Sequence, residues 1–131
     1  MVGLVIVSHS SKIAAGTCEM AYQMANPGQK IIAAGGTADD GIGTDAVKIA
    51  AAIEAADDGS GVLITVDLGS AVLSAETALE LIPEEIKARV KIANAPLVEG
   101  SITAAIQASL GVSLEEVCQT AEDARQLQKF S

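Results

Sequence analysis

The sequence has almost no aromatic side chains: its 131 residues include one Tyr, one Phe and no Trp. Half of the residues are nevertheless apolar, and the mean hydropathy is +0.40. The core must therefore be built from Ala, Val, Ile and Leu, the usual material of parallel strands that helices bury on both faces. At this length we expect residues 1–131 to fold as a single domain.

Other features are missing as well, and each absence excludes a class of protein. No apolar run reaches the ~20 residues of a membrane helix. No basic segment precedes the first apolar run, as it would in a signal peptide. We therefore predict a cytoplasmic protein without a membrane partner. Cys18 and Cys118 form no C-x-x-C pair, so we expect both to be reduced and packed as small apolar groups.

Positive charge and nucleotide-binding motifs are also scarce. Eight basic residues stand against 17 acidic ones, for a net charge of −9. Such a chain repels nucleic acid and favours a partner with a basic face. The sequence contains no G-x-x-x-x-G-K-[ST] motif, which argues against a self-contained ATP-driven kinase. Residues 41–46 match G-x-G-x-x-A formally, but they follow the second predicted strand rather than the first, so the match is weak.

Apolar runs and helix-period patterns alternate along the chain. The pattern predicts strands over residues 2–7, 30–34, 62–66 and 90–93, and helices over residues 12–24, 45–56, 71–81 and 101–110, with a short helical turn near 83–85 and a last helix from 114. Residues 94–100 are expected to form a loop. The buried face of the first helix is expected to carry Ile13, Thr17, Ala21 and Met24. Ser113 and Glu116 have the spacing of a capping box.

This alternation predicts the fold class α/β, a three-layer α/β/α sandwich on a mostly parallel sheet. The expected strand order is 2-1-3-4, as in flavodoxin-like folds. In that order a crevice opens between the carboxyl ends of strands one and three, because the connections leave those strands in opposite directions. The two ends carry Ser8-His9-Ser10 and Asp67-Leu68-Gly69-Ser70, so His9 and Asp67 are expected to face each other.

His9 is the only histidine, and it is the natural candidate for chemistry near neutral pH. A neutral imidazole has one basic nitrogen that can attack phosphorus, provided that the other nitrogen keeps its proton. Asp67 could accept that N–H and orient the ring. The helix that begins near Lys12 could hold phosphoryl oxygens at its N-terminus. The alternative is that His9 is a satisfied polar residue at the sheet edge and that Asp67 is a solvated loop acid or a helix cap.

Small and hydroxyl residues surround the predicted pair and are candidates for phosphoryl or loop support. These supporting residues are Ser8, Ser10, Ser11, Gly36, Thr37, Gly69 and Ser70. The glycines after strand two would let the backbone approach a phosphoryl group, although a plain wide turn fits them equally well. A metal site would have only His9 and acids to draw on, so no metal is expected.

Five segments together resemble a known family: V-I-V-S-H-S (5–10), G-G-T (35–37), I-G-T (42–44), V-D-L-G-S-A (66–71) and P-L-V-E-G (96–100). They are similar, in this order, to the phosphotransferase subunits of bacterial dihydroxyacetone kinases. That family belongs with the mannose-type enzyme IIA domains of the phosphoenolpyruvate-dependent phosphotransferase system (PTS). The combination is specific, because it spans most of the chain.

The resemblance implies that His9 takes phosphate from the histidine-containing phosphocarrier protein and passes it to ADP on the nucleotide-binding subunit of dihydroxyacetone kinase. A tele-phosphohistidine, with phosphate on Nε2, is the expected intermediate, although the residues alone leave either ring nitrogen open. Asp67 matches the aspartate that orients the histidine. ADP would be carried by a partner, and no cofactor would be tightly bound.

The resemblance also implies a homodimer and a third kinase subunit that binds dihydroxyacetone. Some family members continue into further phosphocarrier domains. Because this sequence stops at Ser131, we expect it to draw phosphate from a separate carrier.

Three alternatives stay open from the sequence. One is a mannose-type enzyme IIA that serves a sugar transporter, which the segment D-L-G-S-A disfavours. Another is a flavodoxin-like module that binds a nucleotide or FMN without a covalent step. The third is a small metal chelatase, which would normally have more metal-binding residues than this chain offers.

Overall fold

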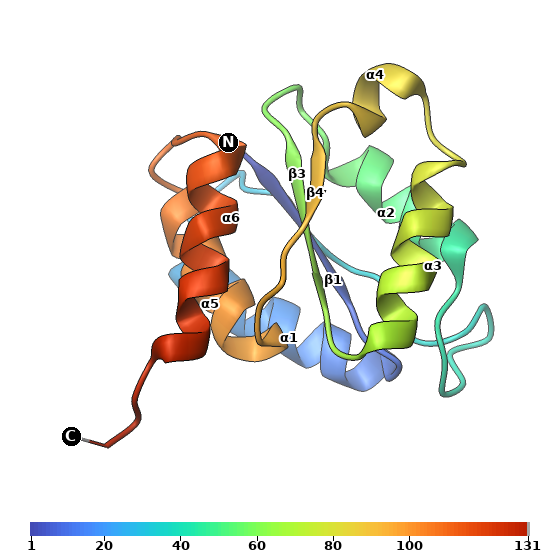
Figure 1. The fold of residues 1–131 in the computed structure, drawn as a ribbon, viewed down its shortest axis with the longest axis horizontal. Coiled ribbons are helices and arrows are strands. Elements are labelled where there is room, and N and C mark those ends of the chain that lie inside the picture. The colour runs from blue at the N-terminus through green and yellow to red at the C-terminus, as the bar shows by residue number, and fades with distance from the viewer. Residues whose placement is uncertain (131) are drawn as a thin grey trace.

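A parallel sheet lies at the centre of the computed structural model, which describes residues 1–130. Within these residues four strands are arranged in the order β2-β1-β3-β4, as predicted. Figure 1 labels three of them, β1, β3 and β4. Their bounds are β1 Gly3–Val7, β2 Ile31–Ala33, β3 Val62–Val66 and β4 Val90–Ile92. β1 and β3 pair in register from Gly3 with Val62 to Val7 with Val66. Their carboxyl ends therefore finish side by side.

Helices cover both faces of the sheet and complete the predicted α/β/α sandwich. Their bounds are α1 Ser11–Met24, α2 Ala46–Ala56, α3 Gly69–Leu79, α4 Glu84–Lys87, α5 Leu97–Ala108 and α6 Leu114–Asp123, followed by a 3-10 turn η1 at Ala124–Gln126. Figure 1 shows α5 and α6 on one side of the sheet and α2 and α3 on the other. α1 joins the layer of α5 and α6.

The central strand β1 is buried on both faces. Val5 and Val7 lie in the core with α2 and α3, while Leu4 and Ile6 lie in the core with α1, α5 and α6. This burial explains why the first strand is a continuous apolar run rather than an alternating one. Gly3 is needed where α2 touches the strand, because a Cβ there would lie 2.1 Å from the carbonyl oxygen of Ala56.

The buried face of α1 differs from the prediction. Thr17 and Ala21 are buried as expected, but Ala14 replaces Ile13, which is 50% exposed, and Met24 is 57% exposed. The helical period and the middle of the buried face were right, and the two ends of that face were wrong. The small side chains let α1 pack closely on β2 and α5.

Helix α5 begins four residues earlier than predicted, within the segment expected to be a loop. Pro96 is its N-cap residue, where a missing N–H costs nothing, and the carboxylate of Glu99 favours the positive end of the helix. Gly100 lies inside this helix. Glycine suits the position because a Cβ there would lie 3.0 Å from the Ala95 Cβ and 3.3 Å from the Ala121 carbonyl oxygen. A side chain at this position would be tightly crowded, so glycine favours the close packing of α5 and α6.

Smaller expectations were met in part. The Ser113 hydroxyl accepts the Glu116 N–H at 3.2 Å, but the Glu116 carboxylate lies 3.4 Å from that same hydroxyl, so half of the capping box forms. Cys18 and Cys118 are free and packed among apolar groups, as predicted, and burial raises the pKa of both thiols.

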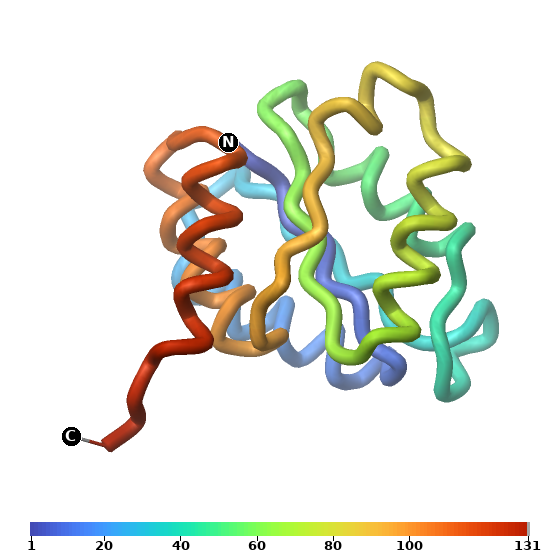
Figure 2. Tube along the Cα trace, viewed as in Figure 1, coloured from blue at the N-terminus to red at the C-terminus, as the bar shows by residue number. Residues whose placement is uncertain are grey.

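The candidate site lies where β1 leads into α1 and β3 leads into α3. The Cα trace in Figure 2 brings these two turns together at the lower edge of the molecule, with the loop between β2 and α2 (cyan) passing beside them. None of the helices formed by residues 1–130 combines the length and apolarity needed to cross a membrane.

Candidate active site

The imidazole of His9 is held by Asp67 across the carboxyl ends of β1 and β3. Nδ1 of His9 lies 2.9 Å from Oδ1 of Asp67. Oδ2 accepts the main-chain N–H of His9 at 2.9 Å and the hydroxyl of Ser8 at 2.9 Å. The strand order predicted that His9 and Asp67 face each other, and they do. Both carboxylate oxygens are therefore used to fix the histidine and the residue before it.

The hydrogen bonds at Asp67 decide its charge. Burial acts to raise the pKa of this carboxyl, but bonds from the His9 main chain and ring, the Ser8 hydroxyl and the Leu68 N–H outweigh burial and lower it. Asp67 is thus ionised at neutral pH and can only accept hydrogen bonds. In a neutral imidazole the proton must then sit on Nδ1, which leaves the lone pair of Nε2 free.

The free nitrogen of His9 faces the first turn of α3. Nε2 lies 2.5 Å from the hydroxyl of Ser70, which can donate to it. α3 begins at Gly69, and its N-cap residue is Leu68, whose side chain carries no hydrogen-bonding atom. The Ala71 N–H donates to the Leu68 carbonyl at 3.0 Å, which leaves the N–H groups of Gly69 and Ser70 and the positive end of the helix dipole at the start of α3.

Nε2 points to a different helix from the one at which the sequence predicted phosphoryl oxygens to bind. The sequence pointed to α1, whose N-terminus follows His9 directly. The hydroxyl of Ser10 already caps that helix by accepting the Ile13 N–H at 3.3 Å. The contact between Ser70 and Nε2 instead makes α3 the helix that meets the nitrogen. A sequence pattern cannot reveal this, because it depends on which way the ring points.

The predicted serines on the β1 side shape the turn around His9. Ser8 is buried, and besides its bond to Asp67 its hydroxyl accepts the Ser10 N–H at 3.0 Å. Ser10 is the helix cap, and Ser11 is the half-buried first residue of α1. The hydrogen bonds of Ser8 and Ser10 hold the backbone around His9 rather than the ring itself.

The two predicted residues after β2 make different contacts. Gly36 contacts the site, whereas the hydroxyl of Thr37 bonds within its own loop. The N–H of Gly36 donates to the Ser8 carbonyl at 3.0 Å, and its φ of +78° favours glycine. The hydroxyl of Thr37 donates to the Asp39 carboxylate at 2.6 Å and accepts the Gly41 N–H at 2.9 Å. Thr37 therefore stabilises a turn of the loop.

Two further residues support the site, and each has little sequence signal. The N–H of Gly43 donates to the carbonyl oxygen of His9 at 2.8 Å. Nζ of Lys48, on α2, lies 3.0 Å from the Gly35 carbonyl oxygen and 2.8 Å from that of Thr37. A single lysine on a helix is usually solvated, so only the fold shows that Lys48 secures the loop beside His9.

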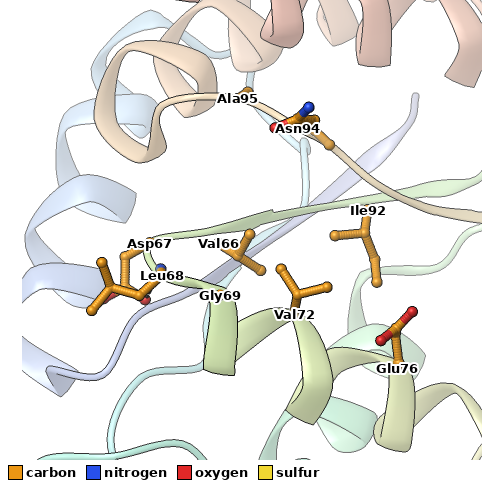
Figure 3. A pocket seen from close by; sticks show the side chains of 10 residues that line it. Val66, Asp67, Leu68, Gly69, Val72, Glu76, Ile92, Asn94 and Ala95 are labelled. Atoms are coloured by element: carbon orange, nitrogen blue, oxygen red, sulfur yellow. Dashed lines mark hydrogen bonds between the residues drawn. The ribbon is translucent and has the colours of Figure 1, made fainter.

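A cavity of about 500 Å³ lies next to Asp67 and is lined by residues of β3, α3 and β4 and of the segment that follows β4 (Figure 3). In Figure 3 the side chains of Val66, Val72 and Ile92 point into a common space between α3 and the edge of the sheet. Leu68 and Glu76 also line it, and Leu68 is 62% exposed. The part of the chain that the structure describes has no group of three or more His, Cys, Asp or Glu side chains placed to hold a metal ion.

Comparison with known proteins adds an independent line of argument. Residues 3–118 match the family model EIIA-man, described as the PTS system fructose IIA component. A solved crystal structure of a protein of unknown function has a TM-score of 0.83 and 38% sequence identity, with 93% of each chain covered. The fold and most of the chain are therefore shared with these proteins.

Curated relatives carry more specific names. The phosphoryl donor subunit DhaM of the PEP-dependent dihydroxyacetone kinase of Escherichia coli K12 is 50% identical over 120 residues, which cover 89% of this chain and 25% of the relative. The corresponding subunit of dihydroxyacetone kinase 2 of Listeria innocua is 44% identical over 119 residues, with 91% and 95% covered. The chain thus spans about a quarter of the length of the first relative and nearly all of the second.

Proposed function

Because this chain belongs to the EIIA-man family of PTS IIA components, we propose that it is a phosphoryl carrier that is transiently phosphorylated on Nε2 of His9. One observation carries the proposal: Asp67 holds Nδ1 at 2.9 Å while Nε2 faces the hydroxyl of Ser70 at the start of α3. One ring nitrogen is thereby kept protonated, and the other is free to act as a nucleophile beside an anion-binding helix end.

The transfer needs no proton to move. The lone pair of Nε2 forms a bond to phosphorus while the bond from phosphorus to the donor's imidazole nitrogen breaks. The ring of His9 keeps its proton on Nδ1 and becomes cationic, and the carboxylate of Asp67 compensates that charge. In the onward step an oxygen of the acceptor attacks phosphorus and the bonding pair returns to Nε2. Phosphoryl transfer of this kind depends chiefly on position and charge.

The phosphoryl oxygens would be held by groups that already lie at Nε2. The Ser70 hydroxyl has only to turn from the nitrogen to a phosphoryl oxygen, and the N–H groups of Gly69 and Ser70 at the start of α3 supply further donors. Ser8, Ser10 and Gly36 keep the His9 segment in place, as their hydrogen bonds indicate.

The names of the relatives point to the partner system. Both relatives described above are named phosphoryl donor subunits of PEP-dependent dihydroxyacetone kinases. We therefore propose that His9 receives phosphate from a histidine-containing phosphocarrier protein and delivers it to ADP on the nucleotide-binding kinase subunit. The regenerated ATP would phosphorylate dihydroxyacetone on another subunit. The net charge of −9 suits partners with basic faces, and the family resemblance favours a homodimer.

A labelling experiment tests the covalent step. The chain is incubated with phosphoenolpyruvate, enzyme I and the phosphocarrier protein, and an acid-labile mass gain of one phosphate is expected. His9→Gln should abolish this gain, and ¹⁵N NMR of the labelled ring should place phosphate on Nε2. Label that persists in His9→Gln would refute the assignment.

A second experiment tests the acceptor. The isolated phosphorylated chain should lose its phosphate to ADP only when the nucleotide-binding kinase subunit is present. Discharge by the membrane components of a sugar transporter, without discharge to ADP, would instead support a mannose-type enzyme IIA of sugar transport.

A further inference from the structure

A short hydrogen bond joins two hydroxyls that lie outside the predicted site. Oγ1 of Thr44 lies 2.6 Å from Oγ of Ser74, and both residues are half-buried. Thr44 belongs to the loop between β2 and α2, whereas Ser74 lies on α3. The bond therefore ties this loop to the helix that faces Nε2.

Both ends of this bond lead to His9. Ser74 follows Ser70 by one helical turn, and residues four apart lie on the same side of a helix. Thr44 directly follows Gly43, whose N–H donates to the His9 carbonyl at 2.8 Å. The loop thus contacts the His9 main chain through Gly43 and contacts α3 through Thr44, and α3 in turn contacts Nε2 of His9 through Ser70.

The rest of α3 offers little that would fix its position so finely. Its fully buried contacts are Ala71, Ala75 and Ala78, whose short side chains interlock little with the sheet, and Val72 and Leu79 pack against the core only partly buried. Its first residue is glycine, and Gly69 and Ser70 are both exposed. A directional bond between two half-buried hydroxyls restricts sliding and rotation in a way that alanine contacts do not.

We propose that Thr44 and Ser74 are positioning residues that aim the hydroxyl of Ser70 at Nε2 of His9. This inference rests on the proposed phosphoryl transfer at His9 and concerns residues that do not touch the ring. Removing either hydroxyl lets the first turn of α3 shift, so that the contact of 2.5 Å between Ser70 and Nε2 is no longer maintained.

The variants for the test are Thr44→Val, which keeps the shape of the side chain, and Ser74→Ala. We expect each to slow phosphorylation of His9 by the phosphocarrier protein about 10-fold, because displacements of up to 1 Å cost as much as ~100-fold in rate. Thr44→Ser keeps a hydroxyl and should retain most of the rate. Thr77→Val is the matched control, since the Thr77 hydroxyl donates at 3.0 Å to the Leu73 carbonyl within α3; it should retain the wild-type rate.

A double-mutant cycle that combines Thr44→Val with Ser70→Ala distinguishes positioning of Ser70 from a general structural effect. If the pair acts through Ser70, Thr44→Val should cause no further loss in the Ser70→Ala background. The ¹⁵N resonance of Nε2 should also move in the same direction in Thr44→Val, Ser74→Ala and Ser70→Ala, and stay in place in Thr77→Val. Urea unfolding identifies any variant that fails to fold, in which case the other member of the pair carries the test.

The inference is overturned if both folded variants are labelled at the wild-type rate, or if Thr44→Val costs the same factor with and without Ser70. Either result leaves the proposed function intact, provided that wild-type protein is labelled and His9→Gln is not. If His9→Gln is labelled as the wild type is, the proposed function itself is overturned.

Discussion

Replacement of Asp67 by Asn is the sharpest single test of the site. The side chain keeps its shape, but one of the two accepting oxygens becomes an NH₂ group that can only donate. If that group takes the place of Oδ2, it meets the N–H of His9 and the hydroxyl of Ser8, which both donate to that oxygen. If it takes the place of Oδ1, it donates to Nδ1, which moves the ring proton to Nε2 and removes the nucleophilic lone pair.

The expected loss follows from the charge that develops on the ring. Two unit charges separated by the observed 2.9 Å attract by ~1.4 kcal/mol in water and by ~6 kcal/mol at an effective dielectric constant near 20. A tenfold change in rate corresponds to about 1.4 kcal/mol, so these limits bracket losses of ~10-fold and ~10⁴-fold. The side chains of His9 and Asp67 are 22% and 18% exposed, between those limits. We expect Asp67→Asn to slow transfer by about 10²- to 10³-fold, as for other charge-stabilising groups.

The assay is rapid-quench transfer of labelled phosphate from the phosphocarrier protein, combined with ¹⁵N NMR of the ring tautomer. Glu76→Gln is the control, because it also removes one negative charge beside the cavity but lies on an exposed surface of α3. It should change the rate by less than about 2-fold, since a single exposed charge affects mainly the encounter rate. A wild-type rate in Asp67→Asn, with label still on His9, would refute the role given to Asp67.

Three further predictions concern the site and the fold. Ser70→Ala should slow transfer by about 10- to 100-fold and leave the urea midpoint nearly unchanged, because Ser70 is exposed and donates one hydrogen bond to the reacting nitrogen of His9; an unchanged transfer rate would remove Ser70 from the mechanism. Stability should fall on acidification below about pH 4, because folding lowers the pKa values of Asp57 and Asp67 from 3.8. The hydrogen bond from the Arg89 guanidinium lowers the pKa of Asp57, and the hydrogen bonds that Asp67 accepts lower its pKa against the effect of burial. Both carboxylates stabilise the fold above their unfolded pKa and lose that contribution as pH falls through the folded values, so urea titrations of Asp57→Asn should show a weaker acid dependence. Gly3→Ala should destabilise the fold by about 3 kcal/mol, since its Cβ meets main chain at 2.1 Å; an unchanged urea midpoint would show that α2 can move away.

The sequence pattern predicted the layers and the strand order because buried strands and half-buried helices differ in their period. It also predicted that His9 and Asp67 meet, since both follow strands that finish at the same edge. The error at α5 has a definite cause: Gly100 signals a loop, but here it makes room for α6. Close helix packing is a tertiary requirement, and no local pattern reports it.

In the site, too, the sequence indicates the residues next to His9 but not the contacts that depend on the tertiary structure. Ser8 and Ser10 adjoin the histidine and were natural candidates, yet the hydroxyl that meets Nε2 is that of Ser70, 61 residues away. Ser70 could be placed near the site from the strand order, but its contact depends on the orientation of the ring. Lys48 and Thr44 have ordinary positions in the sequence, and only their bonds across the loop distinguish them.

The short edge strands of the sheet bear on how the protein behaves at high concentration. β2 and β4 have three residues each, against five in the central strands. An edge strand presents unpaired N–H and C=O groups that can recruit another chain, and short edges carrying lysine resist such recruitment. Lys30 precedes β2, and the exposed Lys91 lies within β4. Short edges with lysine at each are therefore expected to disfavour edge-to-edge aggregation of this apolar, alanine-rich chain.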